Sequence, residues 1–536
     1  MEVSVIGNSQ AKICRAELAH REIRFFYGSE VIPFESRNRV SFGGQSSRCK
    51  VIGLQCSARA VRCEAVMSDN LPVLKSTPRS RSFENVRLFV GLPLDTVSVC
   101  NTVNHSKAIA AGLRALKLLG VEGLELPVFW GVAEKEAMGK YDWSGYLAVA
   151  EMVQKAGLKL QVSLCFHGSN QAKIPLPSWV TRFGDSEPGV YFTDKSGRQY
   201  KDCLSFAVDD LPVLDGKTPM EVYLGFCESF KSAFSDFIGN TISGITIGLG
   251  PDGELRYPSH HHSLTGTKIS GAGEFQCYDK HMLASLRQHA ESTGNPLWGL
   301  GGPHYAPTYD QPPHSSTFFK DGGSWESVYG HFFLSWYSSL LVSHTDRVLS
   351  LASSTFNGTG VALSGKLPLL HSWHKLRSRP SELTAGFYGT GNRDGYEVVS
   401  ELFAKNSCGM IIPGMDLSDA HQPAESLSSP ESLLAHVKTS CKKFRVVVSG
   451  QNSSDPVPDG FNRIAENLRE ENTAIDLFTY QRMGAYFFSP EHFPSFTEFV
   501  RSLSQMELPA DDLPAEKEGV AASVGSPTGT AAMQAA

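Results

Sequence analysis

The residues best suited to chemistry stand just after short apolar runs of the sequence. They comprise two carboxylic acids, basic or cationic side chains and two amides: His167, Glu254, Lys366, His371, Asp416, Gln451, Asn452 and Arg482. No glycine-rich phosphate-binding loop accompanies them, so the set suits a hydroxyl-rich ligand better than a nucleotide. A single residue of this kind is about equally well explained as a structural hydrogen-bonding partner at the rim of a fold.

The apolar runs are the expected strands, because each is nearly continuous in apolar residues, as a strand buried on both faces should be. They cover residues 87–94, 123–130, 159–167, 244–250, 361–367, 408–415, 444–450 and 475–482. Amphipathic stretches, such as 105–119 and 146–156, alternate with them. Eight strand–helix repeats predict a single α/β domain, a (β/α)8 TIM barrel with long insertions after strands three and four. A doubly wound open sheet is the alternative, but no GxGxxG follows an early strand.

The start and the end of the chain differ from this body. Between Ser36 and Cys63 there are six basic residues, no acidic one and many serines. This composition predicts a chloroplast transit peptide over residues 1–63, with processing near Cys63. An ordinary disordered arm and a basic DNA-binding arm are the alternatives, and the acidic residues among the first 35 count against the transit peptide. We expect a linker at 64–81, the barrel at 82–505 and a disordered tail at 506–536.

Composition restricts the classes of partner. The net charge of -6 is too mild to indicate a nucleic-acid or acidic-membrane partner, and no uninterrupted apolar stretch is long enough for a membrane helix. Eleven cysteines include no CxxC pair, which disfavours structural zinc and a disulfide framework. The run His260, His261 and His262 is better explained as surface decoration than as a metal site. We therefore expect no metal and no cofactor.

One segment carries a family resemblance. Residues 248–260 read GLGPDGELRYPSH, which closely resembles the acid motif of the beta-amylase family, glycoside hydrolase family 14. Further matches follow in the family's order: KYDWSGY at 140–146, GEFQCYDKH at 273–281, FFLSWYSSLL at 332–341, ELTAGFY at 382–388 and LFTYQRM at 477–483. The resemblance covers about residues 87–500 and is greatest to a chloroplast member of the family that is described as inactive.

The resemblance implies an inverting exo-hydrolysis that releases beta-maltose from the non-reducing ends of starch. Such a reaction needs a protonated carboxyl group to assist the leaving oxygen and an ionised one to activate water. Glu254 matches the acid position. The base position falls in Gly450-Gln451-Asn452, where glutamine can orient a water molecule but cannot take its proton.

Other positions that the resemblance assigns to the substrate are divided. His167, Lys366, His371, Asn452 and Arg482 match family residues that support the sugar or the base, and Asp416 matches a family glutamate. Pro127 replaces a substrate-binding aspartate, and Pro413 replaces a threonine that shifts on binding. The flexible lid is shortened to residues 168–173 and lacks the lid's aspartate, so closure that excludes water is not expected.

Three functions follow as hypotheses. The first is a catalytically inactive homologue with a regulatory or scaffolding role in starch (α-1,4-glucan) degradation in plastids, in contact with a weakly bound maltodextrin or another starch-metabolising protein. The second is a weakly active exo-glucan hydrolase in which Asp416 or Asp419 substitutes as base. The third is a nuclear regulatory protein that uses the basic arm, although no helix-loop-helix pattern accompanies that arm. The first hypothesis includes neither a nucleic-acid nor a membrane partner.

Overall fold

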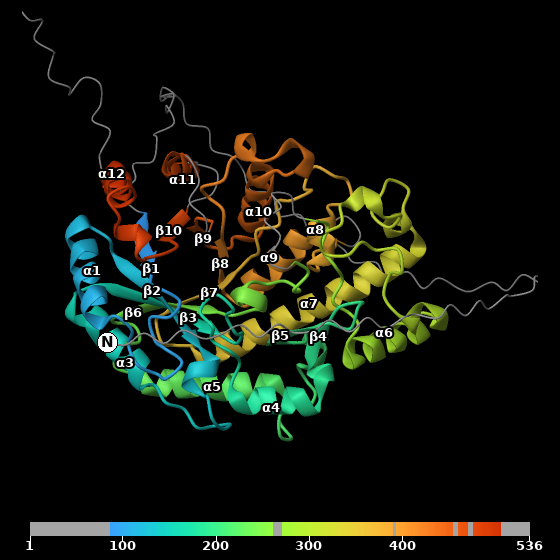
Figure 1. The fold of residues 1–536 in the computed structure, drawn as a ribbon, viewed down its shortest axis with the longest axis horizontal. Coiled ribbons are helices and arrows are strands. Elements are labelled where there is room, and N and C mark those ends of the chain that lie inside the picture. The colour runs from blue at the N-terminus through green and yellow to red at the C-terminus, as the bar shows by residue number, and fades with distance from the viewer. Residues whose placement is uncertain (1–85, 261–270, 390–392, 454–458, 470–474, 505–536) are drawn as a thin grey trace, which may run out of the picture. The chain divides into compact units, whose positions relative to one another are not determined.

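The computed structural model describes residues 86–260, 271–389, 393–453, 459–469 and 475–504 (Figure 1). The chain divides into two compact units, Met1–Lys75 and Ser76–Ala536, and all described residues belong to the second. The expected transit peptide at 1–63, linker at 64–81 and tail at 506–536 lie outside the described residues and stay predictions.

Eight parallel strands close into a barrel in the order β1-β10-β9-β8-β7-β6-β3-β2. Their bounds are β1 Arg87–Gly91, β2 Gly123–Phe129, β3 Lys159–Cys165, β6 Ile242–Ile247, β7 Ala362–Lys366, β8 Gly409–Ile412, β9 Val448–Gln451 and β10 Ile475–Tyr480. The strand β2 is buried along its whole length, since one face fills the barrel and the other contacts the surrounding helices. The predicted (β/α)8 barrel is confirmed. Because all eight strands are parallel, their C-terminal ends meet at one mouth.

Helices separate the strands and surround the barrel (Figure 1). The α-helices are α1 Ser106–Leu119, α2 Trp130–Ala133, α3 Ser144–Lys155, α4 Ser178–Ser186, α5 Pro219–Ala233, α6 Lys280–Ser292, α7 Val328–Thr355, α8 Pro380–Thr384, α9 Gly395–Lys405, α10 Pro430–Phe444, α11 Gly460–Arg469 and α12 Phe493–Ser504. Short 3-10 turns are η2 Pro188–Val190, η3 Phe206–Val208, η4 Pro251–Gly253, η5 Pro296–Leu300, η6 Pro313–Ser315, η7 Ser324–Glu326, η8 Asp419–His421, η9 Ala424–Ser426 and η10 Tyr486–Phe488. Local sequence fixes several helix starts; for example, Thr218 and Glu221 form a capping box at the start of α5.

The insertions lie where they were predicted, after β3 and after β6. The first contains α4 and a two-stranded antiparallel hairpin, β4 Tyr191–Thr193 and β5 Gln199–Leu204, which the sequence patterns did not indicate. One strand prediction needs correction, since residues 444–450 do not form a continuous strand. The helix α10 extends to Phe444, Arg445 ends it in the left-handed region with φ 59°, and β9 begins only at Val448.

The seven described cysteines are all free, and only Cys100 is exposed. Within the described residues, no helix combines the length and the apolar character that crossing a membrane requires.

Candidate active site at the barrel mouth

Glu254 lies directly after η4, on the loop that leaves β6. The backbone N–H of Leu255 donates to the carbonyl of Lys366 at 2.9 Å, which ties this loop to the C-terminal end of β7. The two oxygens of the Glu254 carboxylate have different cationic partners. Lys366 Nζ lies 3.1 Å from Oε1, and Arg256 Nε donates to Oε2 at 2.9 Å. The carboxylate is therefore held in one orientation at the barrel mouth.

Arg256 organises the loop around this acid. Its Nη2 lies 2.5 Å from Oδ2 of Asp252, a residue whose backbone adopts φ 55°. Burial opposes the charge of the guanidinium, but the nearby Glu254 and Asp252 carboxylates raise the pKa of Arg256. Gly253 also has a positive φ of 76°, and a Cβ there would lie 3.3 Å from His167 Nε2. The glycine of the motif thus lets the loop approach His167 closely.

Gln451 is the last residue of β9 and faces the inside of the barrel. On the neighbouring β10, Phe478 packs outward against Phe499 of α12, so the next residue, Thr479, points inward. Gln451 pairs in register with Thr479 and therefore shares its orientation. Its side chain is buried, and it makes no hydrogen bond to any other described side chain.

The spacing between Glu254 and Gln451 follows from the order of the strands. Glu254 follows β6 and is bridged to Lys366 on β7, while Gln451 ends β9, so β7 and β8 lie between the two positions. Three spacings of about 4.8 Å make about 14 Å along the wall of the barrel at backbone level, and because the barrel is closed the direct distance across the mouth is shorter than this path. The acid and the base of inverting glycosidases are about 6.5–9.5 Å apart. Gln451, an amide, thus stands across the barrel mouth from Glu254.

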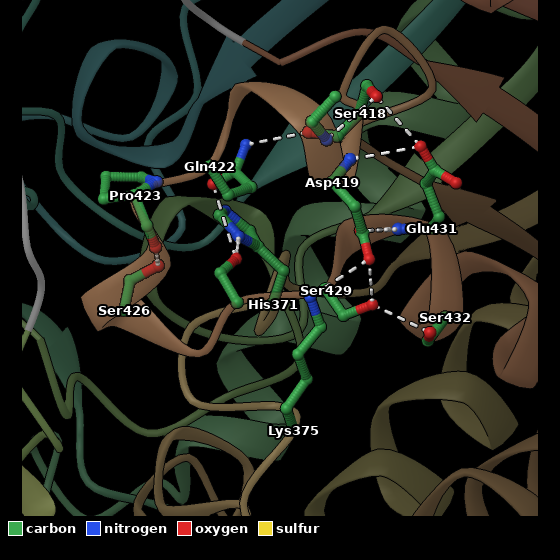
Figure 2. A network of polar contacts seen from close by, with 12 residues as sticks. His371, Lys375, Ser418, Asp419, Gln422, Pro423, Ser426, Ser429, Glu431 and Ser432 are labelled. Carbon is green, nitrogen blue, oxygen red and sulfur yellow. Dashed lines mark hydrogen bonds and ion pairs between the residues drawn. The ribbon is translucent and has the colours of Figure 1, made fainter.

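Two other acids near the mouth are already engaged. Asp416 is buried, and its carboxylate accepts from the backbone N–H and the hydroxyl of Ser453, both at 2.6 Å. Asp419 accepts from Ser429 Oγ at 2.6 Å and from the backbone N–H of Glu431 at 3.2 Å. Figure 2 shows Asp419 directed at these groups and at Lys375, whose Nζ lies 3.4 Å away. Partial burial opposes the charge of Asp419, but these contacts lower its pKa.

The comparisons with known proteins identify the family. Residues 89–508 match the model described as Glycosyl hydrolase family 14. The chain belongs to this family. It is 72% identical over 539 residues to "Inactive beta-amylase 9" of Arabidopsis thaliana, with 100% of both chains covered. It is 39% identical over 435 residues to "Beta-amylase 1, chloroplastic" of the same plant, covering 78% of this chain and 76% of that protein.

Among solved structures, the catalytic domain of beta-amylase from Paenibacillus polymyxa matches with a TM-score of 0.65 and 25% identity. The match covers 80% of this chain and 100% of that chain. The predicted membership of the beta-amylase family and the predicted fold are both confirmed.

The remaining residues that resemble family-14 site positions are brought to the mouth with protein partners of their own. His371 Nδ1 lies 2.6 Å from Ser428 Oγ, and burial lowers the pKa of His371 to about 4 (Figure 2). His167 Nδ1 lies 2.7 Å from the carbonyl of Gly168, and burial lowers the pKa of His167 as well. Arg482 Nη1 donates to the carbonyl of Leu92 at 2.6 Å.

Asn452 joins β9 to the end of β10. Its Oδ1 accepts from the backbone N–H of Gln481 at 2.6 Å, and its Nδ2 donates to the carbonyl of the same residue at 2.8 Å.

The two prolines predicted to replace substrate-contacting residues, Pro127 and Pro413, add no polar side-chain group to the mouth. Pro127 pairs with Ser163 in the register of β2 and β3, and its ring faces the barrel interior without a donor or an acceptor. Pro413 follows β8, and two residues later the N–H of Met415 donates to the carbonyl of Gln451 at 3.0 Å. The loop after β8 is thus bonded directly to the strand that carries Gln451.

The segment that the resemblance predicts to be a shortened lid, residues 168–173, forms a closed turn. The backbone N–H groups of Ser169 and Ile174 donate to each other's carbonyls, at 2.7 and 3.0 Å. Gly168 N–H donates to the carbonyl of Asp202 at 2.7 Å, and Asn170 Nδ2 donates to the Asp202 carboxylate. Burial, together with the charge of Asp252, raises the pKa of Asp202. The segment is anchored to β5 at both its start and its tip, which leaves little chain to move.

Sequence reasoning missed Glu125, a carboxylate buried inside the barrel on β2. It accepts from Ser163 Oγ at 2.6 Å and from Gln481 Nε2 at 3.3 Å, and Arg482 Nη1 lies 3.6 Å from it. A lone acid within the apolar run GLELPVF was the available signal. Glu125 precedes Pro127 by two residues on the same face, about 7 Å deeper along the strand, so it does not replace the aspartate.

The histidine run is only partly described. His260 Nδ1 lies 3.0 Å from Ser259 Oγ, whereas His261 and His262 lie outside the described residues. The expectation of surface decoration there stays a prediction.

Proposed function

We propose that this chain is a catalytically inactive member of glycosyl hydrolase family 14 that regulates or scaffolds α-1,4-glucan breakdown in plastids. The observation that carries the proposal is Gln451 at the base position. Its amide can hydrogen-bond a water molecule, but it has no oxygen basic enough to take the proton from that water. The relative that shares 72% of the sequence is named an inactive beta-amylase, which supports the same conclusion.

The environment of Gln451 also disfavours a substitute base. A general base must come within about 3 Å of the attacking water. The oxygens of Asp416 accept two short hydrogen bonds from Ser453, and Asp419 is held by Ser429 and the start of α10. Recruiting either acid would require breaking these contacts.

Maltose release from soluble starch tests the proposal. The unaltered chain should release maltose no faster than its Glu254→Gln variant, which lacks the acid. Turnover that exceeds this control would overturn the proposal. It would favour the second candidate, a weakly active inverting exo-hydrolase, for which the intact Glu254 with its two cationic partners is the supporting observation.

The regulatory part of the proposal needs a second measurement. A hydrolytically active family-14 enzyme is assayed on starch granules with and without this chain at equal concentration. A change in maltose release, absent with an unrelated protein of similar size, is the expected result. An unchanged rate across several starch-degrading hydrolases would remove the regulatory role while leaving the inactivity intact.

The plastid location is supported by the basic, serine-rich leader and by the name of the chloroplastic relative. N-terminal sequencing of the mature protein from isolated chloroplasts should find a start near Glu64. A full-length protein recovered from nuclei would instead favour the regulatory DNA-binding alternative. No nucleic-acid or membrane partner is part of the proposal.

A further inference from the structure

A groove of about 520 Å³ lies where η7, the loop before α8 and the loop before α9 meet. None of its lining residues ends a barrel strand, and neither Glu254 nor Gln451 contributes to it. The lining residues are Trp325, His374, Lys375, Leu376, Arg377, Ser378, Arg379, Glu382, Leu383, Phe387, Tyr388, Gly389, Asp394 and Gly395. The volume falls within the range of about 300–1,000 Å³ of small-ligand sites.

A fixed, flat surface forms one wall of the groove. The guanidinium of Arg377 lies over the ring of Trp325, 5.6 Å from its centroid, and Trp325 Nε1 donates to the carbonyl of Lys320 at 3.1 Å. On the other side, the Tyr388 hydroxyl lies 3.0 Å from His331 Nδ1. Trp325 and Tyr388 are both partly exposed. Flat rings with a polar edge bury apolar area while leaving hydrogen-bonding groups at the rim.

The charges of the groove are balanced rather than of one sign. Glu382 is buried between His374, at 2.7 Å, and Arg379, at 3.7 Å. Asp394 pairs with His436, and its other oxygen accepts from the N–H of Glu397 at 2.9 Å.

The two most exposed cations of the groove also have acidic neighbours. Arg377 pairs with Glu326, and Lys375 lies 3.4 Å from Asp419. A ligand with a fixed charge would therefore meet as much repulsion as attraction.

The exposed ends of these ion pairs still offer both hydrogen-bond donors and hydrogen-bond acceptors to a ligand. The side chains of Arg377, Lys375 and Asp394 are 67%, 52% and 41% exposed. Each guanidinium has five N–H donors, of which one carboxylate uses only some. Donors and acceptors at the rim of an aromatic wall match a neutral ring that carries many hydroxyl groups, since a hydroxyl both donates and accepts.

We infer that this groove binds a short segment of neutral α-glucan, independently of the barrel mouth. The choice of α-glucan as the ligand rests on the proposed function, whereas the preference for a neutral, hydroxyl-rich ring rests on the groove itself. Binding there requires no catalysis. It gives the inactive chain a means of contacting the polymer even though its lid is anchored and its base position is an amide.

Calorimetric titration of the full chain with maltoheptaose tests the inference. The unaltered chain should bind, and Trp325→Ala should weaken the affinity by about tenfold or more because the wall is lost. Tyr305→Ala is the matched control, since Tyr305 is an aromatic residue that is 70% exposed outside the groove. Lys366→Met measures how much of the binding takes place at the barrel mouth. Tyr305→Ala should leave the affinity within about twofold.

Two results would overturn the inference: no binding by the unaltered chain, or binding that Lys366→Met abolishes and Trp325→Ala leaves unchanged. Tighter binding of glucose 6-phosphate than of maltoheptaose, lost in Arg377→Ala, would also overturn it by showing an anion site. Arg377→Ala provides a second groove variant if Trp325→Ala fails to fold. Starch hydrolysis by the unaltered chain would refute the proposed inactivity but not the groove, so the two failures are distinguishable.

Discussion

Placing a carboxylate at Gln451, the proposed base position, should produce little hydrolysis. In Gln451→Glu the new side chain keeps nearly the same shape and stands across the barrel mouth from Glu254, three strand positions away. A general base contributes about 10²–10⁴ in rate, or about 2.7–5.4 kcal/mol of transition-state free energy. That is the most the substitution returns if everything else at the mouth is in place.

Two other features of the mouth should still limit hydrolysis in this variant. Pro127 offers the sugar no polar contact, and the lid segment is bonded to Asp202 at Gly168 and Asn170. Without closure, water remains and the ring is not held for in-line attack, so a restored base acts on a badly positioned substrate. We expect Gln451→Glu to raise kcat/KM by less than about tenfold above the background of the chain.

The assay is maltose release from maltopentaose and soluble starch, with Glu254→Gln/Gln451→Glu as the background. Adding Pro127→Asp to Gln451→Glu should raise the rate further than either change does alone, because groups that act as a unit are not additive. A rise of about 10³ or more from Gln451→Glu alone would refute this reasoning. It would mean that the missing base accounts for the inactivity and that the proline and the short lid are neutral.

Three further predictions concern stability. Arg256→Met should lower the free energy of unfolding by about 3 kcal/mol in urea denaturation, and adding Glu254→Gln should recover part of the loss because less unpaired charge remains. Gly450→Ala places a Cβ 1.9 Å from Met415 Sδ and should lower the free energy of unfolding by about 1–3 kcal/mol. The double variant with Met415→Ala should lose less stability than the sum of the two single variants, and strict additivity would contradict the contact. The pKa of His371, about 4, lies below the value of about 6.5 in an unfolded chain, so the folded state binds fewer protons between these values. The free energy of unfolding should therefore fall by on the order of 2–3 kcal/mol as pH falls from about 6.5 to 4, and His371→Gln should flatten that slope.

The barrel could be predicted from the sequence because its strands are buried on both faces. A run such as KLQVSLC, which forms β3, has few local alternatives once a helical pattern follows it. The ends of the strands were less predictable than their existence. The run FRVVV continues apolar character from α10 into β9, and only the backbone turn at Arg445 separates them. The hairpin strand QYKDCL was missed because its residues are mostly polar and it pairs with only three residues of β4.

The contacts of the predicted site residues could not be predicted from the sequence. Motif resemblance proposed Glu254 and Gln451 as acid and base positions, and the strand order brings both to the same mouth. Nothing local indicated that Asp416 would bond Ser453, which lies 37 residues further along the chain, or that Glu125 would approach Arg482. Such contacts depend on which strands become neighbours, and that is settled by closure of the barrel rather than by local sequence.

Because of these internal contacts, a residue that matches a family site position can be present at the mouth without binding a sugar. Asn452 bonds both backbone groups of Gln481, and Arg482 donates to the carbonyl of Leu92. A sugar hydroxyl that sought either side chain would exchange one hydrogen bond for another, with a small net gain. The same bonds tie β9, β10 and β1 together at the mouth. Asn452 and Arg482 thus have a structural role that needs no bound sugar, so their presence at the mouth is not by itself a sign of hydrolysis.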